Sequence, residues 1–280
     1  MLTLDEKKIR KGKPIGLPYQ GSKKKISKKI VEIIKQNFGK DKPIYDIFGG
    51  GGAITAECIL NGLEVRYNDL DHAISGMFQR VLSTDRKFLK TLIVSHDEFF
   101  KIRDKENKTV DDELKLLINS FGNNRRCYLY SKKMSDLKYN LAVEIIKKHD
   151  VFYGYRKTET YLKAKGIFKE KLQQFQQLEQ LERLGQLQQL QRLGQLQQLE
   201  GLRVTNLDYK TFSNVENAIF YLDPPYESTT LEGYSIDEFD SQSFYDWAHE
   251  MSKKNIVLIS SYEISDERFQ CVYEFKNARH

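Results

Sequence analysis

The sequence predicts an α/β protein with a doubly wound, mostly parallel β-sheet and an inserted, mainly helical lobe. Three observations predict this class. A run of glycines separates a short apolar run from a helical pattern, the next apolar run ends in acidic residues, and short apolar runs return after a long polar stretch. Strands that alternate with helices in this way form a parallel sheet. At 280 residues the chain is long enough for one such domain with an added lobe.

The first half of the expected sheet begins with an amphipathic helix over residues 26–38, where apolar residues recur at helical spacing. Ser22 is its expected N-cap and Gly39 its end. The elements expected next are a strand at 44–48, a helix at 53–60 and a strand at 64–69. These three form a βαβ unit, which requires parallel strands.

A polar, helical stretch interrupts the strand and helix pattern, which resumes after residue 202. The elements expected there are strands at 203–207, 218–222 and 255–261, a helix at 244–253 and one more strand at 270–275. We therefore predict four parts: the N-terminal half of the sheet domain (1–100), the lobe (101–170), a Leu/Gln-rich insertion (171–202) and the C-terminal half of the sheet domain (203–280).

The Leu/Gln-rich insertion carries an apolar residue at every third position from Leu172 to Leu202. It includes a nine-residue tandem unit, residues 183–191 followed by 192–200. Because an α-helix turns about 100° per residue, a spacing of three moves the stripe backwards by about 60° at each step. We therefore expect no single buried face, and we interpret the insertion as having no mechanistic role.

Charge and composition narrow the classes of function. The net charge is +6, but residues 1–42 hold thirteen Lys and Arg against four Asp and Glu. Such a basic segment favours a polyanion such as nucleic acid. No apolar run approaches the roughly 20 residues that span a bilayer, so we expect a cytoplasmic protein that does not bind membranes. Three scattered cysteines and histidines without ligand spacing predict neither disulfides nor a metal site.

Two motifs carry the candidate chemistry. Residues 46–53 place glycines between a strand and a helix, and Asp69 or Asp71 ends the next strand, a pattern typical of a nucleotide or nucleoside pocket. A tight structural turn would also select glycine, and an NAD-dependent dehydrogenase stays open at this point. Asp223-Pro224-Pro225-Tyr226 directly follows the apolar run at 219–222. Two prolines stiffen this loop at the same edge of the sheet.

Together these motifs resemble the Dam-like DNA adenine N6-methyltransferases, which use S-adenosylmethionine and place the cofactor motif before the DPPY motif. The resemblance covers nearly the whole chain. The segments that match the motifs of the family are Tyr19 to Lys23, Asp46 to Ala53, Asn68 to Asp71, Asn206 to Tyr209, and Asp223 to Tyr226. It implies a Rossmann-like methyltransferase sheet, an inserted target-recognition lobe, double-stranded DNA as partner, and a bacterial or phage-infected cell. A cognate restriction endonuclease is a further expected partner, and a monomer the expected state.

The resemblance also assigns residues. The catalytic set is Asp223, Pro224, Pro225 and Tyr226, and no metal is required. The cofactor set is Tyr19, Lys23, Asp46, Phe48, Gly49, Gly51, Asp69, Asp208 and Asp223. An adenine amino group is a poor nucleophile because its lone pair is delocalised, so Asp223 and the Pro224 carbonyl are expected to accept its hydrogens. Tyr226 is expected to stack on a flipped-out base. Lys24 or Lys25, beside Lys23 in the first turn of the helix, is expected to face DNA phosphate.

The lobe supplies the expected DNA contacts, which are Asn123, Asn124, Arg125, Arg126, Tyr128 and Lys132, with Tyr130 as a further ring. Methylation at N4 of cytosine is an alternative, because that amine presents the same chemical problem. A non-catalytic DNA-binding relative is another, since members of the family usually continue through a final hairpin strand and this sequence stops soon after residue 274.

Overall fold

The computed structural model describes residues 1–18, 22–171, 183–199, 201–226 and 239–275. The chain divides into two compact units. The first, which we call the sheet unit, comprises Met1–Gly16, Ser22–Phe78 and Gly201–His280. The second, which we call the helical unit, comprises Leu17–Gly21 and Gln79–Glu200.

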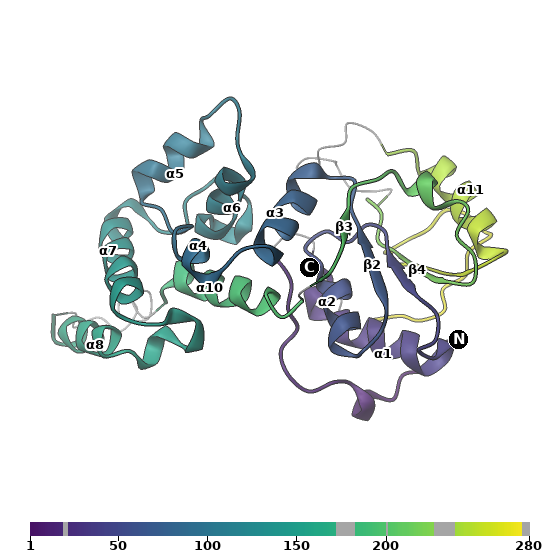
Figure 1. Ribbon diagram of the computed structural model, residues 1–280, viewed down its shortest axis with the longest axis horizontal. Helices are drawn as coiled ribbons and strands as arrows, with labels where there is room; N and C mark the ends of the chain where they lie inside the picture. The colour runs from purple at the N-terminus through teal and green to yellow at the C-terminus, as the bar shows by residue number, and fades with distance from the viewer. Residues whose placement is uncertain (19–21, 172–182, 200, 227–238, 276–280) are drawn as a thin grey trace. The chain divides into compact units, whose positions relative to one another are not determined.

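The sheet unit holds five parallel strands in the order β3-β2-β1-β4-β5 (Figure 1). Their bounds are β1 Ile44–Asp46, β2 Val65–Asn68, β3 Val204–Thr205, β4 Ile219–Leu222 and β5 Ile256–Ile259. β1 lies between β2 and β4, and its Asp46 pairs with Tyr67 on one side and Tyr221 on the other. The strand order therefore reverses between β1 and β4, because β2 and β3 extend to one side of β1 and β4 and β5 to the other. Ligands bind at such a switch point in sheets of this kind.

Helices pack against both faces of this sheet, which confirms the doubly wound arrangement. On one face, α1 (Ser27–Phe38) and α2 (Ala53–Leu60) share a core with Ile44 and Ile219. On the other face, α11 (Ser241–Ser252) packs against Phe220 and Leu222. Neighbouring residues of β4 therefore serve opposite cores, and the whole strand is buried.

Two expected features of the sheet unit are wrong. Ser22 caps the short 3-10 helix η2 (Lys23–Lys25), whereas α1 begins after Ile26 without a side-chain cap. The three lysines therefore precede α1 and do not form its first turn. Residues 270–275 do not form a strand in the described chain, although Val272 accepts a backbone hydrogen bond from Leu2.

The helical unit begins within α3 (His72–Leu82), earlier than the expected boundary at residue 101. Its other α-helices are α4 Arg86–Lys90, α5 His96–Arg103, α6 Val110–Asn119, α7 Lys132–Lys148, α8 Glu159–Lys171 and α10 Gly185–Leu196. The reason for the earlier boundary is packing, because Val94, Phe99 and Ile102 share a core with Leu116 and Tyr128. Segments on both sides of residue 101 thus belong to one folding unit.

The Leu/Gln-rich tract contributes helix α10 to this unit, which gives part of the tract a structural role that the spacing of its leucines did not predict. Leucines 184, 187, 190, 193, 196 and 199 are all at most 1% exposed. A stripe that circles the helix is buried here because α4, α6 and η4 (Val151–Tyr153) surround α10 on several sides. At Gly194 a β-carbon would lie 2.6 Å from the ring of Phe152, so glycine permits the close approach.

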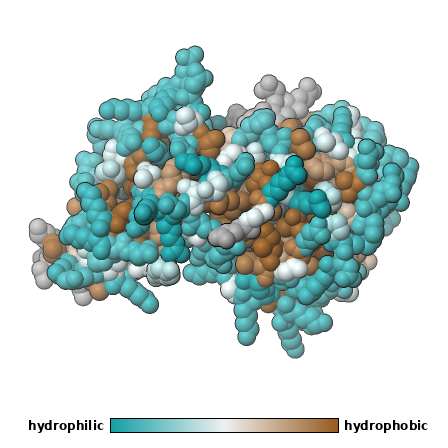
Figure 2. Space-filling model, viewed as in Figure 1, coloured by the Kyte–Doolittle hydropathy of each residue, from teal (hydrophilic) through white to brown (hydrophobic). Residues whose placement is uncertain are grey.

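Hydrophilic residues make up most of the face seen in Figure 2, and hydrophobic residues show between them. Within the part of the chain that the structure describes, no helix is both long enough and apolar enough to cross a membrane.

Candidate active site

The end of β4 brings three predicted residues together. The Lys23 ammonium lies 2.7 Å from a carboxylate oxygen of Asp223 and donates a 2.5 Å hydrogen bond to the Tyr226 hydroxyl. Side chains alternate along β4 and Leu222 faces α11, so the next side chain, Asp223, lies on the face that carries α1 and α2. Lys23 reaches it from the 3-10 helix directly before α1. Lys23 is 8% exposed and the Asp223 side chain 17%, so the pair is shielded but not closed to solvent.

The electrostatics of this cluster favour a charged pair. Burial lowers the Lys23 pKa, but the negative charge of Asp223 and hydrogen bonds to Asp223 and Tyr226 outweigh that effect, so the net pKa is raised. Burial, followed by the charge of Asp223, raises the pKa of Tyr226. Lys23 is therefore an ammonium beside a neutral phenol over the physiological range. The two prolines between Asp223 and Tyr226 in the sequence are shielded as well, since Pro224 is buried and Pro225 half-buried.

The glycine turn after β1 is held by Asp46. This carboxylate is 1% exposed and accepts hydrogen bonds from the Thr55 backbone N–H at 3.1 Å and the Thr55 hydroxyl at 2.6 Å. Burial raises the pKa of Asp46 to about 7, against the effect of these bonds. A β-carbon at Gly49 would lie 2.3 Å from the Tyr67 ring, so packing alone requires glycine there. The structural reason for that glycine stands beside its predicted cofactor role.

Asp69, at the end of β2, links that strand to the same turn. Its two carboxylate oxygens accept from the backbone N–H groups of Gly50 at 2.7 Å and Asp71 at 2.8 Å. Burial raises the pKa of Asp69 to about 6. Asp71, the other acid considered from the sequence, is buried and instead accepts from the N–H groups at the start of α3. Of the two, Asp69 is the one tied to the glycine turn, where Gly51 is also buried.

A pocket of about 170 Å³ opens at the ends of β1, β2 and β3. Its lining residues are Ile47, Phe48, Asn68, Leu70, Leu207, Asp208, Tyr209, Phe239 and Asp240. Phe48 stands edge-on to Phe244 behind it, and the exposed Asp208 side chain caps the turn at 209–212. The pocket therefore combines apolar and aromatic walls with carboxylates, a composition suited to a flat heterocycle with amino groups.

Asn68 belongs to the acidic motif at 68–71, but the sequence did not reveal its structural role. Its amide donates to the carbonyls of Ile47 and Leu207, and its carbonyl accepts from Thr205 and the Leu207 N–H. One buried amide thus joins the ends of β1, β2 and β3. The signal in the sequence is an amide residue at the end of a strand, directly before the acidic residue of the motif.

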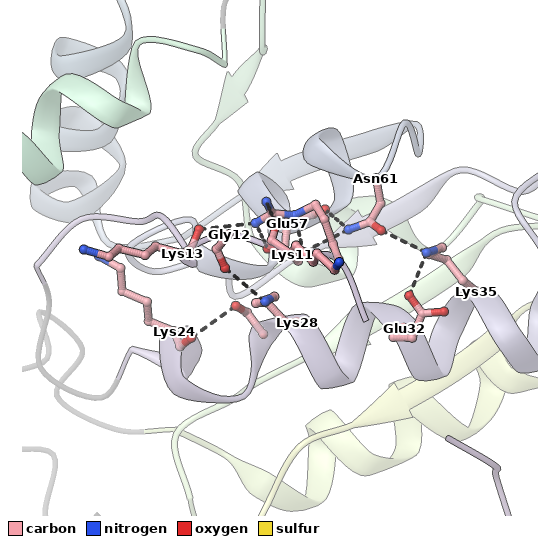
Figure 3. A network of polar contacts seen from close by, with 11 residues as sticks. Lys11, Gly12, Lys13, Lys24, Lys28, Glu32, Lys35, Glu57 and Asn61 are labelled. Carbon is pink, nitrogen blue, oxygen red and sulfur yellow. Dashed lines mark hydrogen bonds and ion pairs between the residues drawn. The ribbon is translucent and has the colours of Figure 1, made fainter. Parts of the chain in front are cut away.

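The basic N-terminal segment folds onto α1 and α2 (Figure 3). Arg10 forms a bidentate pair with the buried Glu57, and both bonds are 2.8 Å long. Lys24 donates to the Gly16 carbonyl and Lys28 to the Gly12 carbonyl. These side chains hold the N-terminal segment in place through their hydrogen bonds. Because the Lys24 ammonium already bonds to a backbone carbonyl, Lys24 is less suited to binding a DNA phosphate than we expected. The exposed lysines of this surface are Lys7, Lys8, Lys11, Lys13 and Lys25.

The predicted DNA-binding residues lie together in the helical unit, but several are occupied by its own structure. Tyr128 is 7% exposed and its hydroxyl donates to the Val94 carbonyl, so it supports the core and offers no accessible ring. The Asn123 amide donates to the Leu117 carbonyl and Arg125 to the Glu113 carboxylate, both in α6. The Asn124 side-chain oxygen accepts from the N–H groups of Arg126 and Cys127. Arg126 and Lys132 are exposed.

Phe121 is the large apolar side chain that the sequence reasoning missed in this loop, and it is 68% exposed. Gly122, Asn123 and Arg125 adopt positive φ angles of 61°, 56° and 61° beside it. Such backbone conformations are rare for non-glycine residues and concentrate at functional loops. The loop therefore exposes the Phe121 ring next to a turn with left-handed backbone conformations.

Tyr19 lies outside the described residues. Among the described residues, no three or more His, Cys, Asp or Glu side chains form a group that could hold a metal ion. A model of the D12 class N6 adenine-specific DNA methyltransferase family matches residues 19–279. No curated protein matches the chain.

Proposed function

Because the chain belongs to the D12 class N6 adenine-specific DNA methyltransferase family, we propose that it moves the methyl group of S-adenosylmethionine to N6 of an adenine flipped out of double-stranded DNA. The observation that carries this proposal is the cluster at the end of β4. There Lys23 joins Asp223 and Tyr226, the acidic and aromatic ends of the DPPY motif.

The residues at the switch point fit the proposed cofactor. When bound, S-adenosylmethionine supplies a methyl group on a positively charged sulfur. The pocket beside Phe48 and Asp208 offers aromatic walls and a carboxylate to an adenine ring, and Asp69 lies at the next strand end for ribose hydroxyls. Tyr19 and Lys23 are proposed to hold the methionine end. Asp46, Gly49 and Gly51 build the turn between these groups.

Asp223 and Pro224 are proposed to prepare the target nitrogen. The adenine N6 lone pair is delocalised into the ring, and acceptors on both of its hydrogens favour a pyramidal nitrogen with an available lone pair. The Asp223 carboxylate and the Pro224 carbonyl provide these acceptors. After transfer the nitrogen carries one proton too many, and the Asp223 carboxylate is the adjacent base that can take it.

Lys23 supports this role by keeping Asp223 ionised. A carboxylate has two oxygens with about four lone pairs, so it can accept from Lys23 and from the base together. An opposite charge at 2.7 Å favours the charged form of both partners. The alignment of cofactor and base in the site is a separate contribution, worth about 7 to 11 kcal/mol when two reactants are held in line.

Tyr226 is proposed to hold the extruded base by stacking. Extrusion costs a few kcal/mol, and stacking on one aromatic ring offsets about 1 to 3 kcal/mol of this cost. The Tyr226 ring is half-buried at the end of β4, close to the acceptor groups that the amino group requires.

The helical unit is proposed to recognise the DNA target. Its loop at 121–128 carries the exposed Phe121, which can pack against bases, and the exposed Arg126. Lys132 follows at the start of α7. In the sheet unit, the exposed lysines of the N-terminal segment are proposed to contact phosphates, which carry no sequence information.

Product analysis tests the proposal. The protein is incubated with unmethylated DNA and methyl-labelled S-adenosylmethionine, and the digested nucleosides are identified by mass. We expect labelled N6-methyladenine from the wild type and none from Asp223→Ala. N4-methylcytosine as the product, or an Asp223→Ala protein with wild-type activity, would contradict the proposed function or its mechanism respectively.

A further inference from the structure

The neighbouring strands β4 and β5 deliver two tyrosines to one place. The strands are parallel, with Leu222 in register with Ile259, and the Ser260 N–H extends the ladder by donating to the Leu222 carbonyl at 2.8 Å. The two segments therefore leave the sheet side by side. Tyr226 follows β4 and Tyr262 follows β5, and their ring centroids are 5.0 Å apart at an interplanar angle of 71°.

Lys23 contacts the Tyr226 side chain at its hydroxyl end. The ammonium is 2.5 Å from the hydroxyl oxygen and 5.0 Å from the ring centroid. These two distances place the ammonium beyond the hydroxyl, near the long axis of the ring, and not over its face. A contact near this axis fixes where the ring points but resists rotation about the axis only weakly, and that torsion is soft in tyrosine.

The edge-to-face contact with Tyr262 opposes rotation of the Tyr226 ring about this axis, because such rotation would move the ring into or away from the second ring. Such contacts are a preferred arrangement of aromatic pairs. Tyr262 is itself 54% exposed, so the contact lies at the open side of the site and not in the core. The Ser261 hydroxyl, which donates to the Glu263 carbonyl, braces the turn that carries Tyr262.

We propose that Tyr262 is a positioning residue for methylation, which sets the plane of the Tyr226 ring and thereby the plane in which the target adenine stacks. This inference rests on the proposed function. It assigns the ring of Tyr262, and not its hydroxyl, to the role, so phenylalanine is a sufficient replacement at this position.

The test compares Tyr262→Ala and Tyr262→Phe with the wild type, on DNA that carries adenine or 2-aminopurine at the target position. For Tyr262→Ala we expect kcat/KM for DNA to fall about tenfold, as for the weakening of one base–aromatic stack, with unchanged affinity for S-adenosylmethionine. Tyr262→Phe should restore kcat/KM to within about twofold, since ring stacking is kept. Bound 2-aminopurine should be brighter in Tyr262→Ala, because the extruded base is less well stacked.

Glu263→Ala is the matched control, since Glu263 is an exposed neighbour in the same turn, and thermal melting verifies the fold of every variant. A Tyr262→Ala protein with wild-type kcat/KM and 2-aminopurine signal would overturn the inference, as would a Tyr262→Phe protein that is as impaired as Tyr262→Ala. A wild type that leaves adenine unmethylated would remove the proposed function and this inference with it.

Discussion

The Lys23 ammonium lies 2.7 Å from a carboxylate oxygen of Asp223, which joins the 3-10 helix before α1 to the loop after β4. Both side chains are largely shielded from water, so the interaction is stronger than that of a surface pair. The same ammonium also bonds to Tyr226. One lysine thus contacts both the Asp223 carboxylate and the Tyr226 hydroxyl, the two ends of the DPPY motif.

Replacement of Lys23 should impair the reaction more than cofactor binding alone explains. Lys23→Ala is expected to lower kcat on the order of 100-fold, as when one preorganised electrostatic group is removed from a site. A double-mutant cycle with Asp223→Ala checks the coupling, since two residues that act together give strongly non-additive losses. Lys254→Ala, an exposed lysine elsewhere in the sheet unit, serves as the control and should retain wild-type kcat. Additive losses in the cycle would contradict a shared role.

Asp46 should make the protein less stable as the pH rises. Its pKa is about 7 in the folded chain because of burial, against about 3.9 when unfolded. Between these values the folded state keeps a proton that the unfolded state has lost, so the free energy of unfolding falls as the pH rises from about 4 to about 7 and is then constant. The shift corresponds to a loss on the order of 4 kcal/mol.

Thermal melting at several pH values measures this effect. Asp46→Asn keeps an acceptor for Thr55 but cannot ionise, so its melting temperature should fall less than that of the wild type between pH 5 and pH 8. Asp41→Asn, at an exposed position of the same unit, should keep the wild-type pH dependence. Parallel curves for Asp46→Asn and the wild type would show that Asp46 does not carry the dependence.

Phe121 should contribute to DNA binding through its exposed ring. Phe121→Ala is expected to weaken the binding of target DNA by about 1 to 3 kcal/mol, the range for base–aromatic contacts. The slope of log Kd against log salt should stay unchanged, because no phosphate contact is removed. Titrations at several salt concentrations measure both quantities. Leu137 is another exposed apolar residue of the helical unit, and Leu137→Ala should bind DNA like the wild type. An equal loss of DNA affinity in both variants would contradict a specific role for Phe121.

Local patterns predict the sheet unit well. The strands at 44–46 and 219–222 and the helix at 53–60 lie within the predicted ranges, because their apolar runs and glycine turns are local signals. The DPPY motif likewise locates Asp223 and Tyr226. Their partners depend on long-range packing: Lys23 meets them only once α1 lies on the sheet, and Tyr262 only through the pairing of β4 with β5.

The leucine tract shows the opposite case, in which a correct local rule did not predict that the leucines are buried. A three-residue spacing does distribute leucines around a helix, but a helix enclosed by neighbours can bury all of them. Burial of polar residues accompanies this arrangement. The Gln186 amide donates to the Val94 carbonyl at 3.0 Å and the Tyr128 hydroxyl at 3.1 Å. These buried groups are out of reach of water, and the glutamine provides their hydrogen-bond partner.

Helix α10 should therefore be essential to the helical unit. Leu190 is fully buried, and Leu190→Ala is expected to lower the free energy of unfolding by about 2 to 5 kcal/mol, whereas Leu162→Ala, at a 54% exposed position in α8, should change it by less than about 0.5 kcal/mol. Deletion of residues 184–199 should abolish cooperative melting of the unit and the recognition of DNA, because it removes leucines from the core and the partners of Val94 and Tyr128. Chemical denaturation measures the free energies of unfolding of Leu190→Ala and Leu162→Ala. Thermal melting and DNA titration measure the stability and DNA binding of the deletion variant. A deletion variant that melts and methylates DNA like the wild type would contradict this prediction and support the interpretation of the tract as a dispensable insertion.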